Sequence, residues 1–217
     1  MVERSWIVIP AYNEARVIEE TLRRMRSFLP FVVVVDDGST DDTAELARGG
    51  GATVLRHAKN LGAGRAFRTG LAYALKQGAT HVCTFDAAGR HDPATIESML
   101  ATMRERNVAV VLGSRYLNDA NDAPFLRRLA RRGAVGISYA RTKLPLTDVR
   151  NDARVFTRRA AETILAGTGD RGRSIDVLRT LARVKLAYTE VSTVVAEPAA
   201  AKIALSLWPS EAVQPAS

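Results

Sequence analysis

The chain has 217 residues, of which 47% are hydrophobic and 25% charged, a balance that excludes a disordered protein and suits one globular domain. Its single cysteine, Cys83, excludes an internal disulfide and is expected to be a buried core residue in a reducing environment. The net charge of +8 favours an anionic partner: nucleic acid, a membrane surface, a sugar nucleotide or a lipid phosphate.

Apolar runs in the sequence are all shorter than the ~20 residues that a membrane-spanning helix needs. The first ten residues, MVERSWIVIP, are too few and too acidic for a signal peptide. We therefore expect a cytoplasmic protein, with any membrane contact being peripheral.

Strand and helix patterns alternate through the first half of the chain. Short runs rich in β-branched residues predict strands at 6–9, 32–35, 52–55, 81–85 and 108–112. Apolar residues at helical spacing predict intervening helices at 17–29, 41–47, 66–77 and 93–103. This alternation predicts an α/β fold with a mostly parallel central sheet flanked by helices. Its ligands are expected outside the carboxyl ends of the strands.

The second half of the chain is less regular. It predicts helices at 125–133, 160–166 and 175–184, and strands at 153–156 and 188–195. Residues 199–217 are rich in Ala, Pro and Ser and are expected to form a flexible tail. Because no repeat or linker divides the sequence, we predict a single domain over 1–217.

The first polar segment follows the strand predicted at 6–9. Pro10 stiffens the turn, Tyr12 can stack on a nucleotide base, and Glu14 can accept a hydrogen bond from one. The alternative is that Glu14 simply begins a helix, where the helix dipole favours an acidic residue.

The second polar segment holds four aspartates within seven residues. Asp41 and Asp42 can cap the following helix. Asp36 and Asp37 then remain at a strand end, where a carboxylate can accept a base N–H such as that of uracil or guanine.

The third polar segment, NLGAGR at 60–65, is glycine-rich and opens a helix. Gly62 allows close backbone approach, and the helix N-terminus together with Arg65 suits a phosphate. The spacing matches neither the Rossmann fingerprint nor the P-loop.

The fourth polar segment, FDAAGRHDP at 85–93, completes an ordered set with GSRY at 113–116. In order and spacing over residues 6–116, the set resembles family 2 glycosyltransferases, especially the polyprenyl-phosphate mannosyl- and glucosyltransferase branch. The family patterns that carry the resemblance are IPAYNE, VVDDGSTD, NLGxGxAxxxG, DADGQHDP and GSRY.

The resemblance implies a GT-A fold in which residues 1–116 bind a nucleotide sugar and residues 117–198 bind the acceptor. The donor is expected to be a UDP- or GDP-sugar, and the acceptor a polyprenyl phosphate or a small molecule. The residues that we predict to bind the nucleotide are Pro10, Tyr12, Glu14, Asp36, Asp37, Gly62, Asp86 and Ala87.

The sequence departs from the family at the pair of aspartates that holds Mg²⁺ or Mn²⁺ against the diphosphate. Asp86 matches the first carboxylate, but Ala88 takes the place of the second and cannot ligate a metal. Arg90 replaces a residue that is often glutamine, and its guanidinium can neutralise phosphate oxygens instead. The first hypothesis is therefore catalysis by Asp86 and Arg90 with weak or absent metal dependence. The alternative is a sugar-nucleotide-binding protein without turnover.

The acceptor half matches the family less closely. The family reads TDxxSGF(R/K) where this chain reads TDVRNDAR at 147–154. We predict Asp148 as the acidic residue nearest the acceptor, with a catalytic role. A base is required only for a hydroxyl acceptor, since a phosphate is already ionised.

Several arginines are predicted on the phosphate and acceptor side. Arg65, Arg115 and Arg131 are candidates for contact with a phosphate. Helical spacing places four arginines on one face, which is either a solvated face or a contact for a lipid phosphate or anionic membrane: Arg127, Arg128, Arg131 and Arg132. The sequence has no zinc-finger spacing or RNP motif, so nucleic acid is an unlikely partner.

Overall fold

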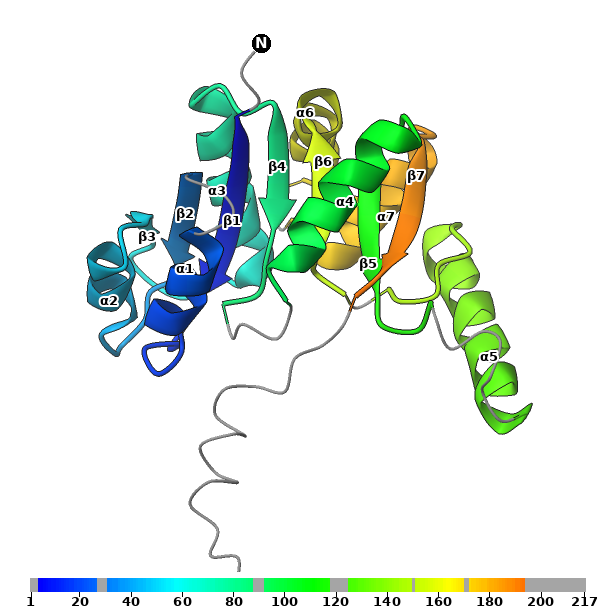
Figure 1. The fold of residues 1–217 in the computed structure, drawn as a ribbon, viewed down its shortest axis with the longest axis horizontal. Helices are drawn as coiled ribbons and strands as arrows, with labels where there is room; N and C mark the ends of the chain where they lie inside the picture. Colours follow the sequence, from blue (N-terminus) through cyan, green and yellow to red (C-terminus); the bar gives the residue numbers. More distant parts are fainter. Residues whose placement is uncertain are drawn as a thin grey trace, which may run out of the picture.

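A computed structural model describes residues 4–26, 31–87, 92–117, 125–149, 151–169 and 172–193, and all structural statements refer to these ranges. Within them, seven strands form one sheet in the order β3-β2-β1-β4-β6-β5-β7 (Figure 1). The strands are β1 (Ser5–Ala11), β2 (Phe31–Asp36), β3 (Thr53–Arg56), β4 (His81–Thr84), β5 (Val110–Ser114), β6 (Arg154–Thr157) and β7 (Tyr188–Ser192). The predicted α/β fold with a mostly parallel sheet is confirmed, because only β6 runs antiparallel to its neighbours.

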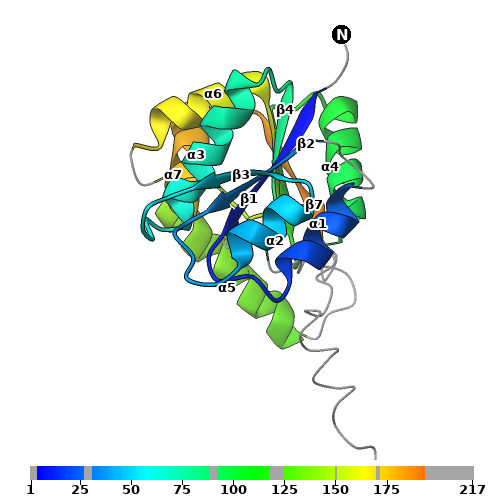
Figure 2. The ribbon, with the colours of Figure 1, turned by 90° about the vertical axis from the view of Figure 1, so that its left-hand side faces the viewer.

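Helices cover both faces of the sheet. They are α1 (Ile18–Arg26), α2 (Thr43–Gly49), α3 (Ala63–Lys76), α4 (Ala94–Glu105), α5 (Phe125–Thr142), α6 (Arg158–Gly167) and α7 (Ser174–Arg183). Figure 2 shows α1, α2 and α4 on one face and α3, α6 and α7 on the other. This three-layer arrangement leaves the carboxyl ends of the parallel strands open at one edge of the sheet.

The core has two apolar layers, one on each face. Successive valines of β2 illustrate the division: Val33 and Val35 pack on the α3 side, whereas Val32 and Val34 pack on the α1 side. A strand buried on both faces needs a continuous apolar run, which is why 32–35 is β-branched throughout. Cys83 is buried as predicted, and desolvation raises the pKa of its thiol to about 12, so the thiol is unreactive.

Among the boundaries that differ from the prediction, two have a clear local physical reason. The strand predicted at 108–112 begins at Val110, because the Val108 N–H still bonds to the Met103 carbonyl at the end of α4. The helix predicted at 125–133 continues to Thr142, and Lys143 ends it with a φ of 64°. No helix of the described residues is both long and apolar enough to cross a membrane.

Candidate functional site

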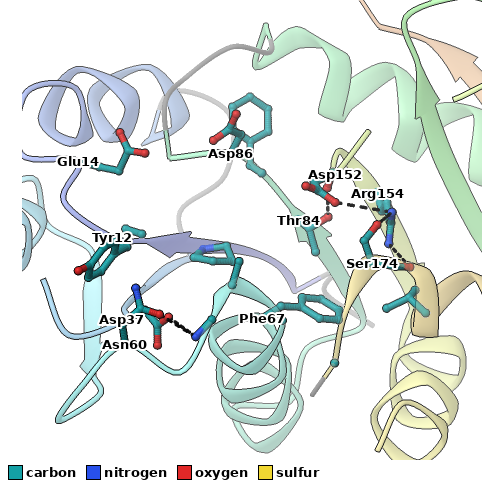
Figure 3. A pocket seen from close by; sticks show the side chains of 18 residues that line it. Tyr12, Glu14, Asp37, Asn60, Phe67, Thr84, Asp86, Asp152, Arg154 and Ser174 are labelled. Carbon is teal, nitrogen blue, oxygen red and sulfur yellow. Dashed lines mark hydrogen bonds and ion pairs between the residues drawn. The ribbon is translucent and has the colours of Figure 1, made fainter. Parts of the chain in front are cut away.

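A cavity of about 540 Å³ opens at the carboxyl ends of β1, β2 and β4 (Figure 3). Among its lining residues are six that the sequence predicted to bind a nucleotide: Pro10, Tyr12, Glu14, Asp37, Gly62 and Asp86. They come from all four polar segments. The parallel topology therefore brings together residues that are up to 76 positions apart in the sequence.

Asp37 lies just after β2, with a side chain that is almost fully buried. One carboxylate oxygen, Oδ1, is 2.6 Å from Nδ1 of His57 and accepts the N–H of Leu61 at 3.0 Å. The other, Oδ2, accepts the N–H of Gly62 at 2.7 Å. A carboxylate has about four acceptor positions. Asp37 thus fastens the glycine-rich loop before α3, uses three of its acceptor positions to do so, and also lines the cavity.

Asp36 lies outside this cavity. Consecutive residues of an extended strand point to opposite sides, so Asp36 and Asp37 separate. The carboxylate of Asp36 is fully buried, accepts the N–H of Ser39 at 3.0 Å and forms an ion pair with Arg56, also at 3.0 Å. That pair lacks hydrogen-bond geometry, since Oδ2 has no hydrogen-bond partner. The geometry makes Asp36 a support for the turn after β2, and the contact predicted between Asp36 and a nucleotide stays a prediction.

The turn after β1 is held by the segment after β2. The N–H of Asn13 donates to Ser39 at 2.9 Å, and the Asn13 side chain accepts from Thr40 at 2.9 Å. The N–H of Glu14 donates to Thr43 at 2.8 Å. These bonds fix Asn13 at a φ of 55° and hold Tyr12, which is 43% exposed, over the cavity (Figure 3).

The second half of the chain supplies cavity residues that the sequence did not identify as a group. β6 lies beside β4, which places Asp152 and Arg154 next to Thr84 (Figure 3). The guanidinium of Arg154 is buried and donates to the carbonyl of Asn151 and to the side chain of Ser174. Desolvation lowers the pKa of Arg154, and the carboxylates of Asp152 and Asp148 oppose that effect.

The family comparison agrees with this geometry. The model of "Glycosyl transferase family 2" matches residues 6–165, which is well over half of the chain. The chain belongs to glycosyl transferase family 2. It is accordingly a glycosyltransferase with the GT-A fold, as the resemblance implied.

Two relatives and one solved structure illustrate the family. The chain is 34% identical over 163 residues to the uncharacterized protein MJ1222 of Methanocaldococcus jannaschii, covering 74% of this chain and 67% of that protein. It is 26% identical to the UDP-N-acetylglucosamine–dolichyl-phosphate N-acetylglucosaminyltransferase of Methanococcus voltae, covering 73% and 71%. A structure of Mycobacterium tuberculosis glucosyl-3-phosphoglycerate synthase with Mn²⁺, UDP and glucosyl-3-phosphoglycerate superposes with a TM-score of 0.64 at 19% identity, covering 94% and 75%. That last similarity shows the shared fold.

Other predicted residues of this family 2 glycosyltransferase lie outside the cavity lining. Ala87 is buried, and its carbonyl accepts the hydroxyl of Thr21 at 3.0 Å. Arg65 is exposed on α3 and does not line the cavity. Ala88, Arg90 and the side chain of Arg131 lie outside the described residues.

Arg115, just after β5, forms a bidentate ion pair with Asp148, which lies in the loop before β6. Nε of Arg115 is 2.7 Å from Oδ2 of Asp148, and Nη2 is 3.0 Å from Oδ1. These hydrogen bonds raise the pKa of Arg115. The Asp148 side chain is buried and absent from the cavity lining. The pair indicates that Asp148 positions the loop before β6, and the catalytic role predicted for it stays a prediction.

Glu190 of β7 holds the same loop from its other side. Its carboxylate accepts the backbone N–H of Thr147 at 3.0 Å and the Thr147 hydroxyl at 2.9 Å. Desolvation raises the pKa of Glu190 above its ordinary 4.5; hydrogen bonds from Thr147 partly offset this, and the nearby Asp148 adds to it. Glu190 therefore helps to hold in place the loop that carries Asp148.

This raised pKa makes the stability of the protein depend on pH. As the pH rises from 4.5 through the raised pKa, the unfolded chain ionises Glu190 first, so the folded state loses stability across that window. Glu190→Gln keeps an acceptor for Thr147 without the charge. We expect it to raise Tm at pH 8 by about 1–3 °C, with the gain vanishing below about pH 4. Thermal unfolding of both proteins at pH 4–8 checks this, and a gain that grows as the pH falls would contradict it.

The described residues do not form a complete metal site. Among them, no group of three or more His, Cys, Asp or Glu side chains is arranged to hold a metal ion. Beside the end of β4 the cavity offers the carboxylates of Asp86 and Asp152, whereas the family's second metal-binding position is Ala88. This donor set does not fit a divalent ion held by the protein alone.

Proposed function

We propose that the cavity binds a nucleoside-diphosphate sugar, with UDP- and GDP-sugars as the expected donors, and that the chain transfers the sugar to an acceptor. The observation that carries the proposal is that Tyr12, Asp37 and Asp86 line one cavity at the ends of three neighbouring strands. Side chains in this arrangement can contact a base, a ribose and a diphosphate at the same time.

Each lining residue has a role suited to its chemistry. Tyr12 offers an exposed ring on which a base can stack. Asp37 uses three of about four acceptor positions, and the remaining one can take a base N–H. The N-terminus of α3 follows Gly62, whose φ of 95° turns the backbone into the helix, and its N–H groups favour a phosphate. Asp86 lies at the end of β4, on the side toward the acceptor half (Figure 3).

Two classes of acceptor agree with the comparisons. The Methanococcus relative acts on dolichyl phosphate, which supports a polyprenyl phosphate. The solved structure with a similar fold holds glucosyl-3-phosphoglycerate, which supports a small molecule. A polyprenyl phosphate acceptor would go with a peripheral membrane contact through the arginines of α5. The side chains at 127, 128, 131 and 132 lie outside the described residues.

A thermal-shift screen of UDP-, GDP- and dTDP-sugars tests the donor proposal. A ligand at a hundred times its dissociation constant stabilises the folded state by about 2.7 kcal/mol, or roughly 5–10 °C for a chain of this size. We expect such a shift with one nucleotide class, and the corresponding free nucleoside to give a smaller one. The proposal fails when no sugar nucleotide raises Tm at millimolar concentration.

We further propose that turnover depends weakly or not at all on a divalent ion, because Ala88 offers no ligand and Arg90 supplies a fixed positive charge. When bound, Mg²⁺ or Mn²⁺ would neutralise the leaving diphosphate. Turnover of the donor identified in the screen is expected to change less than about tenfold between EDTA and millimolar Mn²⁺. By contrast, the solved structure with a similar fold contains Mn²⁺ with UDP, so dependence on a metal is the alternative that this assay tests. Activity abolished by EDTA and restored by Mn²⁺ would refute the arginine hypothesis.

A further inference from the structure

We infer that the acceptor presents a hydroxyl group and that Asp152 takes its proton; this inference rests on the proposed function. The residue lies between the loop that carries Asp148 and strand β6, on the acceptor side of the cavity (Figure 3). None of the sequence patterns assigned it a role. The family pattern TDxxSGF(R/K) has glycine where this chain has Asp152.

The surroundings of Asp152 fix its backbone and leave its carboxylate accessible. The hydroxyl of Thr84 donates to the carbonyl oxygen of Asp152, which anchors the residue to the end of β4. Its side chain is 66% exposed and lines the cavity, with Oδ1 3.6 Å from Nη2 of Arg154. A base must be reachable by the acceptor and must line the site of transfer; the Asp152 side chain is exposed and lines the cavity.

Asp148 does not meet these conditions. Its carboxylate is buried and bound by the side chain and backbone N–H of Arg115, and it does not line the cavity. Among the described acidic residues of the acceptor half, Asp152 is the one that lines the cavity.

The charge of Asp152 favours a neutral hydroxyl over a phosphate on the acceptor side of the cavity. Among the described lining residues the one arginine or lysine is Arg154, whose buried guanidinium donates to oxygens of Asn151 and Ser174 and lies 3.6 Å from Oδ1 of Asp152. A phosphate acceptor beside Asp152 would therefore meet like charge.

The sugar transfer and the proton transfer take place together. The acceptor oxygen forms a bond to the anomeric carbon while its proton moves to the carboxylate of Asp152. The bond from that carbon to the diphosphate oxygen breaks, and its electron pair leaves with the nucleoside diphosphate. Asp152 then releases the proton to solvent. A phosphate acceptor would need no such base, since it is already ionised.

The test compares wild type, Asp152→Asn, Asp152→Gly and the control Asp42→Asn, which changes an exposed carboxylate just before α2 that makes no capping hydrogen bond. Each protein receives the radiolabelled donor identified by thermal shift. The acceptors are undecaprenyl phosphate in detergent, a panel of glycerol, 3-phosphoglycerate and monosaccharides, and water, which reports donor hydrolysis.

We expect transfer to hydroxyl acceptors, or to water when none of the panel fits, to fall by about 100-fold or more in both Asp152 variants and to be unchanged in Asp42→Asn. The donor concentration that gives half of the maximal thermal shift should stay within twofold of the wild-type value in both variants. The acid limb of the wild-type pH–rate profile should disappear in Asp152→Asn, a change that a merely structural role would not produce.

Two results would overturn the inference while leaving the donor site intact. One is transfer to undecaprenyl phosphate at a rate that Asp152→Asn leaves unchanged or increases. The other is equal turnover of hydroxyl acceptors or water by wild type and Asp152→Asn. A wild-type protein that binds no sugar nucleotide would instead refute the proposed function, so the two failures are distinguishable.

Discussion

Replacing Asp37 with asparagine is expected to lower the free energy of unfolding by about 3 kcal/mol and Tm by roughly 6–12 °C. The buried carboxylate accepts from Leu61 and Gly62 and bonds to His57. Asparagine places an NH₂ group where one oxygen now accepts, so at least one buried donor loses its partner. The glycine-rich loop should loosen, and donor affinity should fall with it.

Urea unfolding of wild type, Asp37→Asn and Asp42→Asn measures this effect. Asp42 is exposed at the start of α2, so its replacement should change the free energy of unfolding by less than about 0.5 kcal/mol. If Asp37→Asn proved as stable as wild type and yet lost nucleotide binding, Asp37 would act through the donor alone, and the fastening role described here would be wrong.

Asp148→Asn is expected to destabilise the protein by about 2–3 kcal/mol without removing the catalytic machinery. The asparagine can no longer accept both N–H groups of the Arg115 fork, and the change leaves a guanidinium that is partly buried without its counter-charge. Assayed about 20 °C below its own Tm, the variant should keep kcat within about tenfold of wild type.

A double-mutant cycle with Arg115→Met measures the interaction between Arg115 and Asp148 apart from the other contacts of the loop. We expect a coupling energy of about 1–2 kcal/mol between positions 115 and 148, from urea unfolding of the four proteins. A loss of kcat by 100-fold or more in a folded Asp148→Asn protein would restore Asp148 as a catalytic base and weaken the case for Asp152.

The first half of the fold follows from local signals in the sequence. Short apolar runs ending in aspartate or proline are what buried parallel strands require, and their ends meet at one edge by topology alone. The sequence could therefore predict that Asp37 and Asp86 share a cavity. It could not tell Asp37 from Asp36, because that choice depends on how the strand end turns beyond its last paired residue, Asp36.

The acceptor side depends on contacts between residues far apart in the chain. β6 enters between β4 and β5 and runs antiparallel to both, an arrangement that spacing along the chain does not reveal. That placement brings Asp152 to the cavity and leaves Asp148 to pair with Arg115. The one available signal was the carboxylate at 152 where the family motif has glycine.

Isothermal titration of UDP and GDP tests most directly whether the cavity binds a donor nucleotide through its strand-end residues. The variants are Tyr12→Ala, which removes a ring lining the cavity, and Tyr139→Ala, which removes a similarly exposed ring on α5. We predict that wild type binds one of the two nucleotides and that Tyr12→Ala weakens binding about 5- to 150-fold, whereas Tyr139→Ala changes it less than twofold. Equal affinity of wild type and Tyr12→Ala, or no binding of either nucleotide, would contradict the account.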